Sequence, residues 1–174
     1  MISETLATVE GPWEDGASQI DECQYLFAVD VRELEELTLR LTLVEAKAQA
    51  PLTAEDDSVY GVLSDGARPI QQDSTCRIFE VIFERKYIIS YTVLNESYGR
   101  YPEPPENFTG TLFRIFSGSH LLEFTRRTTY ANDEHPGVLK HFEIVCLNHV
   151  FDVISTHPPR IAVGKQDVQE PRIN

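Results

Sequence analysis

The sequence predicts an α+β fold, with antiparallel β-sheet(s) of about 6–8 strands and one main helix over about residues 119–130. Most apolar side chains occur in short runs that alternate with polar ones, which is the pattern of half-buried strands. One stretch differs, because Ser117-Gly118-Ser119 offers a helix cap and Leu121, Phe124 and Thr128 follow at helical spacing. The 174 residues, 41% hydrophobic and 25% charged, suit one globular domain.

Composition divides the chain into three expected parts. Residues 1–24 hold several acidic residues and few apolar anchors, so we expect an acidic, loose leader that Trp13 pins to the domain. Residues 25–163 are expected to form a single α+β domain. Residues 164–174 are expected to form a flexible tail.

The first expected strands are Tyr25–Val29 and residues 37–43, where leucines alternate with threonine and arginine. A helical stripe that begins at Leu34 competes with the second strand, but the threonines favour the strand. Residues 47–75 have no strong period and are expected to be a long connection, with a short strand near Val59–Leu63.

A β-hairpin is expected in the middle of the chain. Two β-rich runs, Cys76–Phe83 and Tyr87–Leu94, are separated by Glu84-Arg85-Lys86. A three-residue turn there would place seven large side chains on one face of the pair, and a slip of one residue would scatter them. These seven are Phe79, Val81, Phe83, Tyr87, Ile89, Tyr91 and Val93.

A second hairpin is expected near the C-terminal end, because Leu139–Thr156 is too long for one ordinary strand. A two-residue turn at Asn148-His149 would put the large apolar side chains of both arms on one face. These are Phe142, Ile144, Cys146, Phe151 and Val153. A further strand is expected over Thr109–Phe116, after a proline-rich loop over residues 95–108.

The negative charge is concentrated in the first third of the chain. Of a net charge of −13, residues 1–60 contribute −11, with 14 acidic against 3 basic residues. This charge disfavours nucleic acid and anionic membranes as partners and favours a basic protein. It also has a simpler explanation, since net charge keeps a protein soluble.

Cysteine and histidine patterns give no sign of a metal site, and we expect no metal and no cofactor. Cys23, Cys76 and Cys146 lie far apart, and Cys76 and Cys146 sit beside strand-like runs, where a free cysteine behaves as a buried apolar residue. No HxxxH or HxH pair, Gly-x-Ser-x-Gly elbow or phosphate-binding loop occurs. No catalytic residue is therefore assigned, and the chain is expected to be non-enzymatic.

The N-terminus lacks the basic and apolar regions of a signal peptide, and no 18-residue apolar stretch is present. A cytoplasmic protein without a membrane partner is therefore expected.

The best candidate for a binding site is the loop after the first predicted hairpin. It contains Asn95, Glu96, Tyr98, Arg100 and Tyr101. Tyrosine and arginine dominate binding hot spots, and loops on rigid sheets often bind partners. The alternative is that the tyrosines pack over the sheet edge and that Asn95 caps the strand. A secondary candidate group is Arg126 and Arg127 with Asn148 and His149, although Asn148 would also suit the turn.

Three classes of function remain open. The first is an acidic binding protein, such as an inhibitor of a basic toxin or nuclease. The second is a small enzyme or ligand-binding domain with a Tyr/His/Arg-lined pocket. The third is a structural subunit of a larger assembly, with an oligomeric state that the sequence leaves open. The residues expected to line the pocket are Tyr91, Tyr98, Arg114, His141 or His149.

Two stretches, Tyr91–Tyr98 and His141–His149, resemble segments of small bacterial proteins with no assigned activity. The resemblance covers roughly residues 58–162. It implies no substrate and no catalytic residue.

Overall fold

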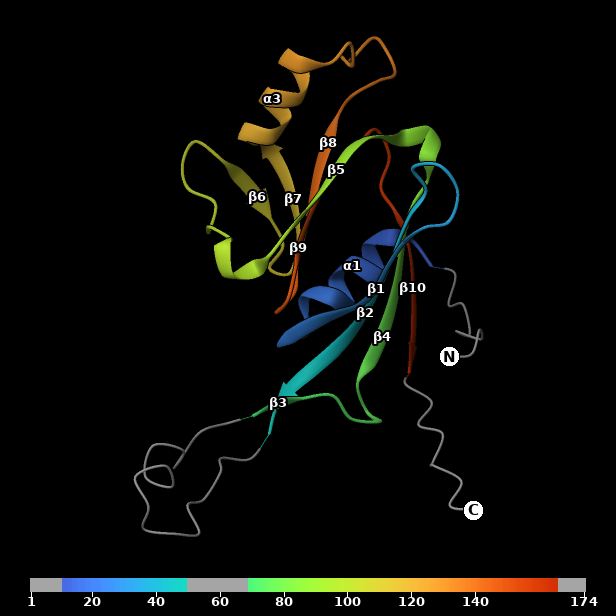
Figure 1. Ribbon diagram of the computed structural model, residues 1–174, viewed down its shortest axis with the longest axis vertical. Helices are drawn as coiled ribbons and strands as arrows, with labels where there is room; N and C mark the ends of the chain where they lie inside the picture. Colours follow the sequence, from blue (N-terminus) through green and yellow to red (C-terminus); the bar gives the residue numbers. More distant parts are fainter. Residues whose placement is uncertain (1–10, 50–68, 166–174) are drawn as a thin grey trace.

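The computed structural model describes residues 11–49 and 69–165, which form two five-stranded antiparallel sheets and two α-helices (Figure 1). The predicted α+β class is confirmed. The ten strands slightly exceed the expected number, and a second helix joins the predicted one. Within these residues, neither helix is long and apolar enough to cross a membrane.

The first sheet has the strand order β1-β2-β4-β10, and β3 pairs with the end of β2. Its strands are β1 (Tyr25–Glu33), β2 (Leu39–Ala48), β3 (Ile70–Gln71), β4 (Arg77–Phe83) and β10 (Arg160–Lys165). The second sheet has the order β5-β9-β8-β7-β6. Its strands are β5 (Ile88–Leu94), β6 (Asn107–Thr109), β7 (Phe113–Gly118), β8 (Lys140–Val145) and β9 (Val150–Ser155). The helices are α1 (Trp13–Asp21) and α3 (His120–Thr128), and two short 3₁₀ turns are η1 (Arg85–Tyr87) and η2 (Glu96–Tyr98).

The two sheets and α1 share one hydrophobic core. Its largest fully buried side chains come from alternate positions of both sheets, as a period of two requires. Phe83 of the first sheet and Phe142 of the second meet with ring centroids 5.7 Å apart. The opposite face of the second sheet carries a smaller apolar cluster, in which Ile154 packs with Leu122 of α3, and polar side chains lie next to this cluster.

The first predicted hairpin is wrong, although both of its strands exist. β4 pairs with β2 and β10, whereas β5 pairs with β9 in the other sheet. The residues expected to form a tight turn instead enter η1, where the Tyr87 N–H donates to the Glu84 carbonyl, and the chain crosses between the sheets. Phe79, Val81 and Phe83 are buried as predicted, but Val93 is 46% exposed.

The second predicted hairpin is confirmed, with its turn one residue earlier. β8 and β9 pair antiparallel, and the Cys146 N–H donates to the His149 carbonyl at 2.8 Å, which leaves Leu147-Asn148 as the turn. This displacement shifts the pairing by two residues, so no side chain changes face. All five predicted apolar side chains are in the core, namely Phe142, Ile144, Cys146, Phe151 and Val153.

The N-terminal part is more ordered than the loose leader expected for residues 1–24. Residues 13–21 form α1, whose Ile20 is fully buried, and residues 1–10 lie outside the described part. Trp13 packs on Phe113 and Phe142 of the second sheet, as its predicted pinning role requires. Gly16 lets the helix approach β10 closely, because a Cβ there would lie 2.6 Å from Ile161.

The strands that follow α1 agree with the sequence patterns except at Leu37, the expected start of the second strand, which lies in the turn before β2 with φ = +58° and is exposed. β1 begins at Tyr25, and β2 buries Leu39, Leu41 and Leu43, so the strand interpretation holds over the helical one. The short strand expected near residues 59–63 lies outside the described residues. The start of the predicted tail, residues 164–165, belongs to β10.

The predicted strand Thr109–Phe116 is divided in two. β6 ends at Thr109, the chain turns at Gly110, and β7 begins at Phe113. Gly110 has φ = +88°, a conformation that favours glycine, and a Cβ there would lie 2.1 Å from the Phe113 carbonyl oxygen.

The predicted helix is confirmed as α3, and Ser119 is its N-cap, with its hydroxyl accepting from the Leu122 N–H at 3.1 Å. The buried face differs from the expected one. Leu122 and Thr125 are buried, whereas Phe124 is 62% exposed. Helical spacing fits the expected stripe of Leu121, Phe124 and Thr128, but it fits the buried pair Leu122 and Thr125 as well, so spacing alone does not select the buried face of so short a helix.

All three cysteines are buried, and we predict that they are unreactive in the native protein. Burial raises the pKa of Cys23 to about 11 and that of Cys146 to about 12, from 9.0, and it also raises the pKa of Cys76. A thiol-specific disulfide reagent at about pH 8 should therefore react slowly with native protein and rapidly in denaturant. Between pH 9 and 12, the thiols of Cys23 and Cys146 lose their protons in the unfolded chain before they do so in the native protein. The free energy of unfolding should therefore fall as the pH rises through this range. Equal rates with and without denaturant would contradict the prediction.

Candidate functional site

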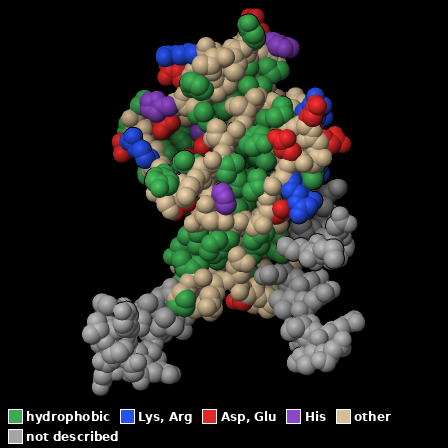
Figure 2. Space-filling view, viewed as in Figure 1, with side chains coloured by type: hydrophobic (Ala, Val, Ile, Leu, Met, Phe, Trp, Pro, Cys, Tyr) green, Lys and Arg blue, Asp and Glu red, His purple; other side chains and the backbone are tan. Residues whose placement is uncertain are grey.

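The main cleft lies on the outer face of the second sheet, between α3 and the proline-rich loop, with a volume of about 420 Å³. Phe142, Ile144 and Phe151 point into the core, so the alternating His141, Glu143 and Asp152 point to the opposite face. The start of α3 and residues 100–106 of the loop form the sides. In Figure 2, histidine, acidic and basic side chains lie together below α3 at the left of the view.

His141 is the centre of the cleft floor and is 3% exposed. Its Nδ1 is 2.9 Å from the Ser119 hydroxyl oxygen, and its Nε2 is 3.0 Å from Asp152 Oδ1. The ring stacks on Phe116, with centroids 4.3 Å apart. The Thr92 hydroxyl donates to the other oxygen of Asp152 at 3.2 Å. The imidazole is therefore held in one orientation from three sides.

A buried carboxylate, Glu143, lies beside this group. Glu143 and Asp152 are direct neighbours on β8 and β9, and Arg114 on β7 donates to Glu143 at 2.6 Å. Both side chains of that ion pair are nearly buried, at 12% and 11% exposed. Burial raises the pKa of Glu143 above its ordinary value, the Arg114 guanidinium opposes the shift, and the Asp152 charge adds to it.

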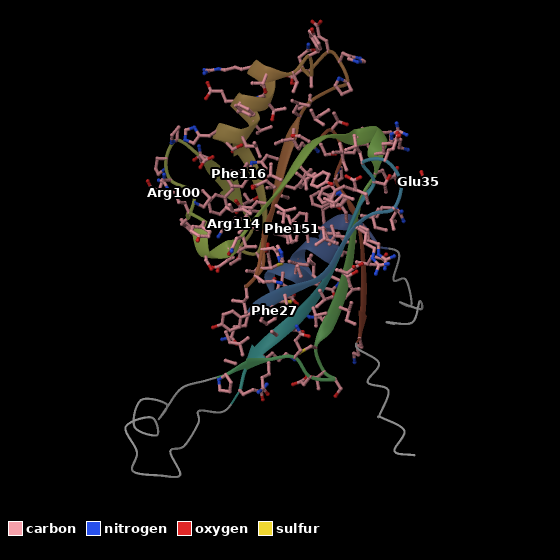
Figure 3. The ribbon with its side chains drawn as sticks, in the orientation of Figure 1. Phe27, Glu35, Arg100, Arg114, Phe116 and Phe151 are labelled. Carbon is pink, nitrogen blue, oxygen red and sulfur yellow. The ribbon has the colours of Figure 1, made fainter. Side chains whose placement is uncertain are left out.

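Aromatic rings hold Arg114 in place. Its guanidinium carbon lies 4.9 Å from the Tyr101 ring and 5.1 Å from the Phe108 ring, and the two rings meet edge to face. The Arg114 Nε also donates to the Thr111 carbonyl at 3.0 Å. Figure 3 labels Arg114, Phe116 and Arg100 on the side of the molecule that carries the second sheet. This part of the fold therefore already holds one guanidinium among rings and a carboxylate.

The predicted binding loop is divided by the structure. Arg100 and Tyr101 line the cleft, and Arg100 pairs with Glu103 at 3.3 Å. Asn95 accepts from the Ser97 N–H at 3.0 Å and so caps η2. Glu96 and Tyr98 lie in that turn, outside the cleft lining, and Tyr98 is 78% exposed. Of the five predicted binding residues, only Arg100 and Tyr101 therefore belong to the cleft.

The secondary candidates lie at separate places. Arg127 pairs with Glu123 on α3, and Arg126 lines a smaller hollow at the start of α3. Asn148 makes two hydrogen bonds with the backbone of Ala28, at 3.0 and 2.9 Å, and so fastens the β8–β9 turn to β1. His149 stacks on Phe151, and its buried Nδ1 has no partner among the described residues.

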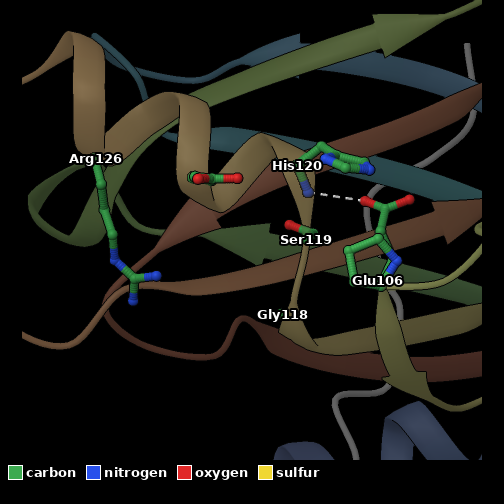
Figure 4. Close-up of a pocket in the computed structure, with 7 residues that line it drawn as sticks. Glu106, Gly118, Ser119, His120 and Arg126 are labelled. Carbon is green, nitrogen blue, oxygen red and sulfur yellow. Dashed lines mark hydrogen bonds between the residues drawn. The ribbon is translucent and has the colours of Figure 1, made fainter.

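The hollow at the start of α3 has a volume of about 270 Å³. Gly118, Ser119 and His120 form one side, and Pro105 and Glu106 form the other. Glu106 accepts from the His120 N–H at 2.9 Å, which joins the loop to the helix (Figure 4). The hollow adjoins the cleft, because Glu106 and His120 line both and Ser119 of the hollow contacts His141 of the cleft.

Glu143, Asp152 and Ser119 are not among the site residues expected from the sequence, and His141 is expected there only as a possible pocket residue. A signal for three of them was present, since His141, Glu143 and Asp152 interrupt apolar strands at alternate positions. Polar residues at such positions mark a second, solvent-facing surface of a sheet. Of the pocket expected from Tyr91, Tyr98, Arg114, His141 or His149, His141 lines the cleft. Arg114 lies beside it through its pair with Glu143.

The fold and the cleft define a two-sheet α+β protein with a polar, mainly acidic site on its second sheet. Comparison of the chain with protein-family models, curated proteins and solved structures finds no match. Within residues 11–49 and 69–165, no group of three or more His, Cys, Asp and Glu side chains is arranged to hold a metal ion.

Proposed function

We propose that the chain is a binding protein whose cleft receives a positively charged ammonium or guanidinium group. The observation that supports this proposal is the charge of the lining, which contains four carboxylates and one arginine, Arg100. The four are Glu103, Glu106, Glu143 and Asp152. Arg100 pairs with Glu103 and Arg114 pairs with Glu143, so two carboxylates have no arginine partner among the described residues. A concave surface with one sign of charge concentrates ligands of the opposite sign.

The carboxylates retain capacity for a ligand. The internal hydrogen bonds of Glu143 and Glu106 use one oxygen of each, Oε1, and an ionised carboxylate accepts at both oxygens. Tyr101 and Phe116 supply aromatic surface in the same lining, where aromatic rings attract cations. A volume of about 420 Å³ is within the range of small-molecule sites.

The same chemistry suits two sources of the cation. One is a small free amine, and the other is a lysine or arginine side chain of a basic partner protein, which the net charge of −13 would attract. In both cases the cation enters beside Glu143 and Asp152.

Isothermal titration with spermidine and with a short lysine- and arginine-rich peptide tests this proposal, with inorganic phosphate as the opposite charge. We expect one or both cations to bind, with affinity that falls as salt rises, and phosphate not to bind. Binding of the peptide alone would identify a protein side chain as the source, and binding of spermidine alone would identify a small amine.

The variants Asp152→Asn and Glu143→Gln should each weaken cation binding by about tenfold or more. Glu134→Gln is the matched control, because Glu134 is an exposed carboxylate in the loop after α3 and is not part of the cleft lining. Thermal unfolding of each variant checks that the fold is retained. Equal affinity in all three variants, or no binding of either cation at low salt, would overturn the proposal.

A further inference from the structure

Ser119, His141 and Asp152 form one continuous line of contacts across three elements. Ser119 precedes α3, His141 lies on β8 and Asp152 on β9. The two contacts measure 2.9 and 3.0 Å, and Ser119 and His141 are 8% and 3% exposed. A hydroxyl within reach of an imidazole that a carboxylate orients is the arrangement that activates a serine nucleophile.

One assignment of the protons satisfies all of these contacts. An ionised Asp152 only accepts, so the His141 Nε2 carries the proton of that bond. In the neutral imidazole, Nδ1 then has a free lone pair and accepts from the Ser119 hydroxyl. The Leu122 N–H donates to the same Ser119 oxygen at 3.1 Å. Ser119 therefore gives its proton towards a base, and its oxygen keeps one lone pair.

Ser119 also borders a hollow that is open to a ligand. Ser119 lines the hollow of about 270 Å³, together with Glu106, Gly118, His120, Glu123 and Arg126 (Figure 4). This volume suits a small acyl group. The hollow and the cleft share Glu106 and His120, whereas Glu143 and Asp152 line the cleft alone, so the hollow adjoins the proposed cation site.

We propose that Ser119 is a nucleophile that accepts the acyl group of a small carboxylic ester, with His141 as its base. The Ser119 oxygen forms a bond to the carbonyl carbon while its proton passes to His141 Nδ1. The ester C–O bond then breaks, and the imidazolium returns the proton to the leaving alkoxide. Water repeats the sequence on the acyl-serine and releases the carboxylic acid. Asp152 is a positioning residue, which holds the tautomer and stabilises the imidazolium.

A fluorophosphonate probe tests the nucleophile directly, because it forms a bond between phosphorus and an activated serine oxygen and releases fluoride. We expect one adduct by intact mass, which peptide mapping places on Ser119 in the unaltered protein. The adduct should be lost in Ser119→Ala and retained in Ser117→Ala, a matched control two residues away whose side chain is exposed. Mapping in the unaltered chain does not depend on how any variant folds.

Hydrolysis of p-nitrophenyl acetate provides the second measurement. Asp152→Asn should reduce the Ser119-dependent rate by on the order of 10³–10⁴-fold and alter its pH profile, because the imidazole loses its tautomer. A folded protein that gives no adduct on Ser119 at millimolar probe would overturn the proposal. An adduct that persists in Ser119→Ala would also overturn it. Cation binding to Ser119→Ala tests the cleft separately, so failure of one proposal is distinguishable from failure of the other.

Discussion

Asp21→Ala should destabilise the protein by about 3 kcal/mol, because one carboxylate oxygen holds three backbone amides. Asp21 Oδ1 accepts from the N–H groups of Thr111, Leu112 and Phe113 at 2.9, 2.8 and 2.8 Å. Phe113 is 1% exposed, so alanine at position 21 leaves polar groups without partners next to the core. For a chain of this length, the expected fall in Tm is about 6–12 °C.

Two further variants make this expectation specific. Asp21→Asn retains a carbonyl acceptor and should lose clearly less stability than Asp21→Ala. Asp15→Ala is the matched control, because Asp15 is an exposed carboxylate on the same helix, and it should change stability by about 0.5 kcal/mol or less. Chemical denaturation of the three variants measures the differences. A loss for Asp21→Ala no greater than that for Asp15→Ala would contradict the assigned role.

The Asp21 contact also shows where sequence reasoning stops. Asp21 lies 90 residues from Thr111, within a segment whose composition suggests an acidic leader. An aspartate that accepts from a distant turn has no local pattern, whereas the helix cap at Ser119 does, because a cap and its helix are adjacent in the chain. Local signals identified α3, but the anchor of α1 on the β6–β7 turn depends on the tertiary fold.

The strands show the same division between local and long-range information. Alternation identified the buried residues of β4 and of the β8–β9 hairpin, because each side chain's face follows from the backbone alone. It did not identify the partner of β4. Two strands that face each other across a core and two that pair in one sheet have the same apolar alternation, so β4 and β5 were wrongly paired.

The candidate site was predictable in part for a related reason. The loop was selected for its tyrosines and arginine, and Arg100 and Tyr101 do line the cleft. His141 and Asp152 stand eleven residues apart on two strands, and only the pairing of β8 with β9 brings them together. Arg114 and Glu143 meet in the same way, through the pairing of β7 with β8.

Arg114→Ala should be the most damaging single change at the cleft, costing about 3–5 kcal/mol at neutral pH, because it leaves the buried Glu143 charge without its partner. Burial already raises the pKa of Glu143, and removal of the guanidinium raises that pKa further. A raised carboxyl pKa costs no stability below pH 4.5, the ordinary pKa, because the carboxyl is protonated in both the folded and the unfolded state. The cost grows as the pH rises through the folded-state pKa. The difference in stability between wild type and Arg114→Ala should therefore be larger at about pH 8 than at about pH 5.

The double variant Arg114→Ala/Glu143→Gln separates the charge effect from the loss of packing against Tyr101 and Phe108. Removal of the uncompensated carboxylate should restore part of the lost stability and flatten the pH dependence, and the remaining deficit measures the lost contacts of the guanidinium with the two rings. Urea unfolding of wild type, both single variants and the double variant at the two pH values gives the complete cycle. If Arg114→Ala lost the same stability at both pH values, the Glu143 charge would not be what Arg114 neutralises, and the acidic floor of the cleft would need another explanation.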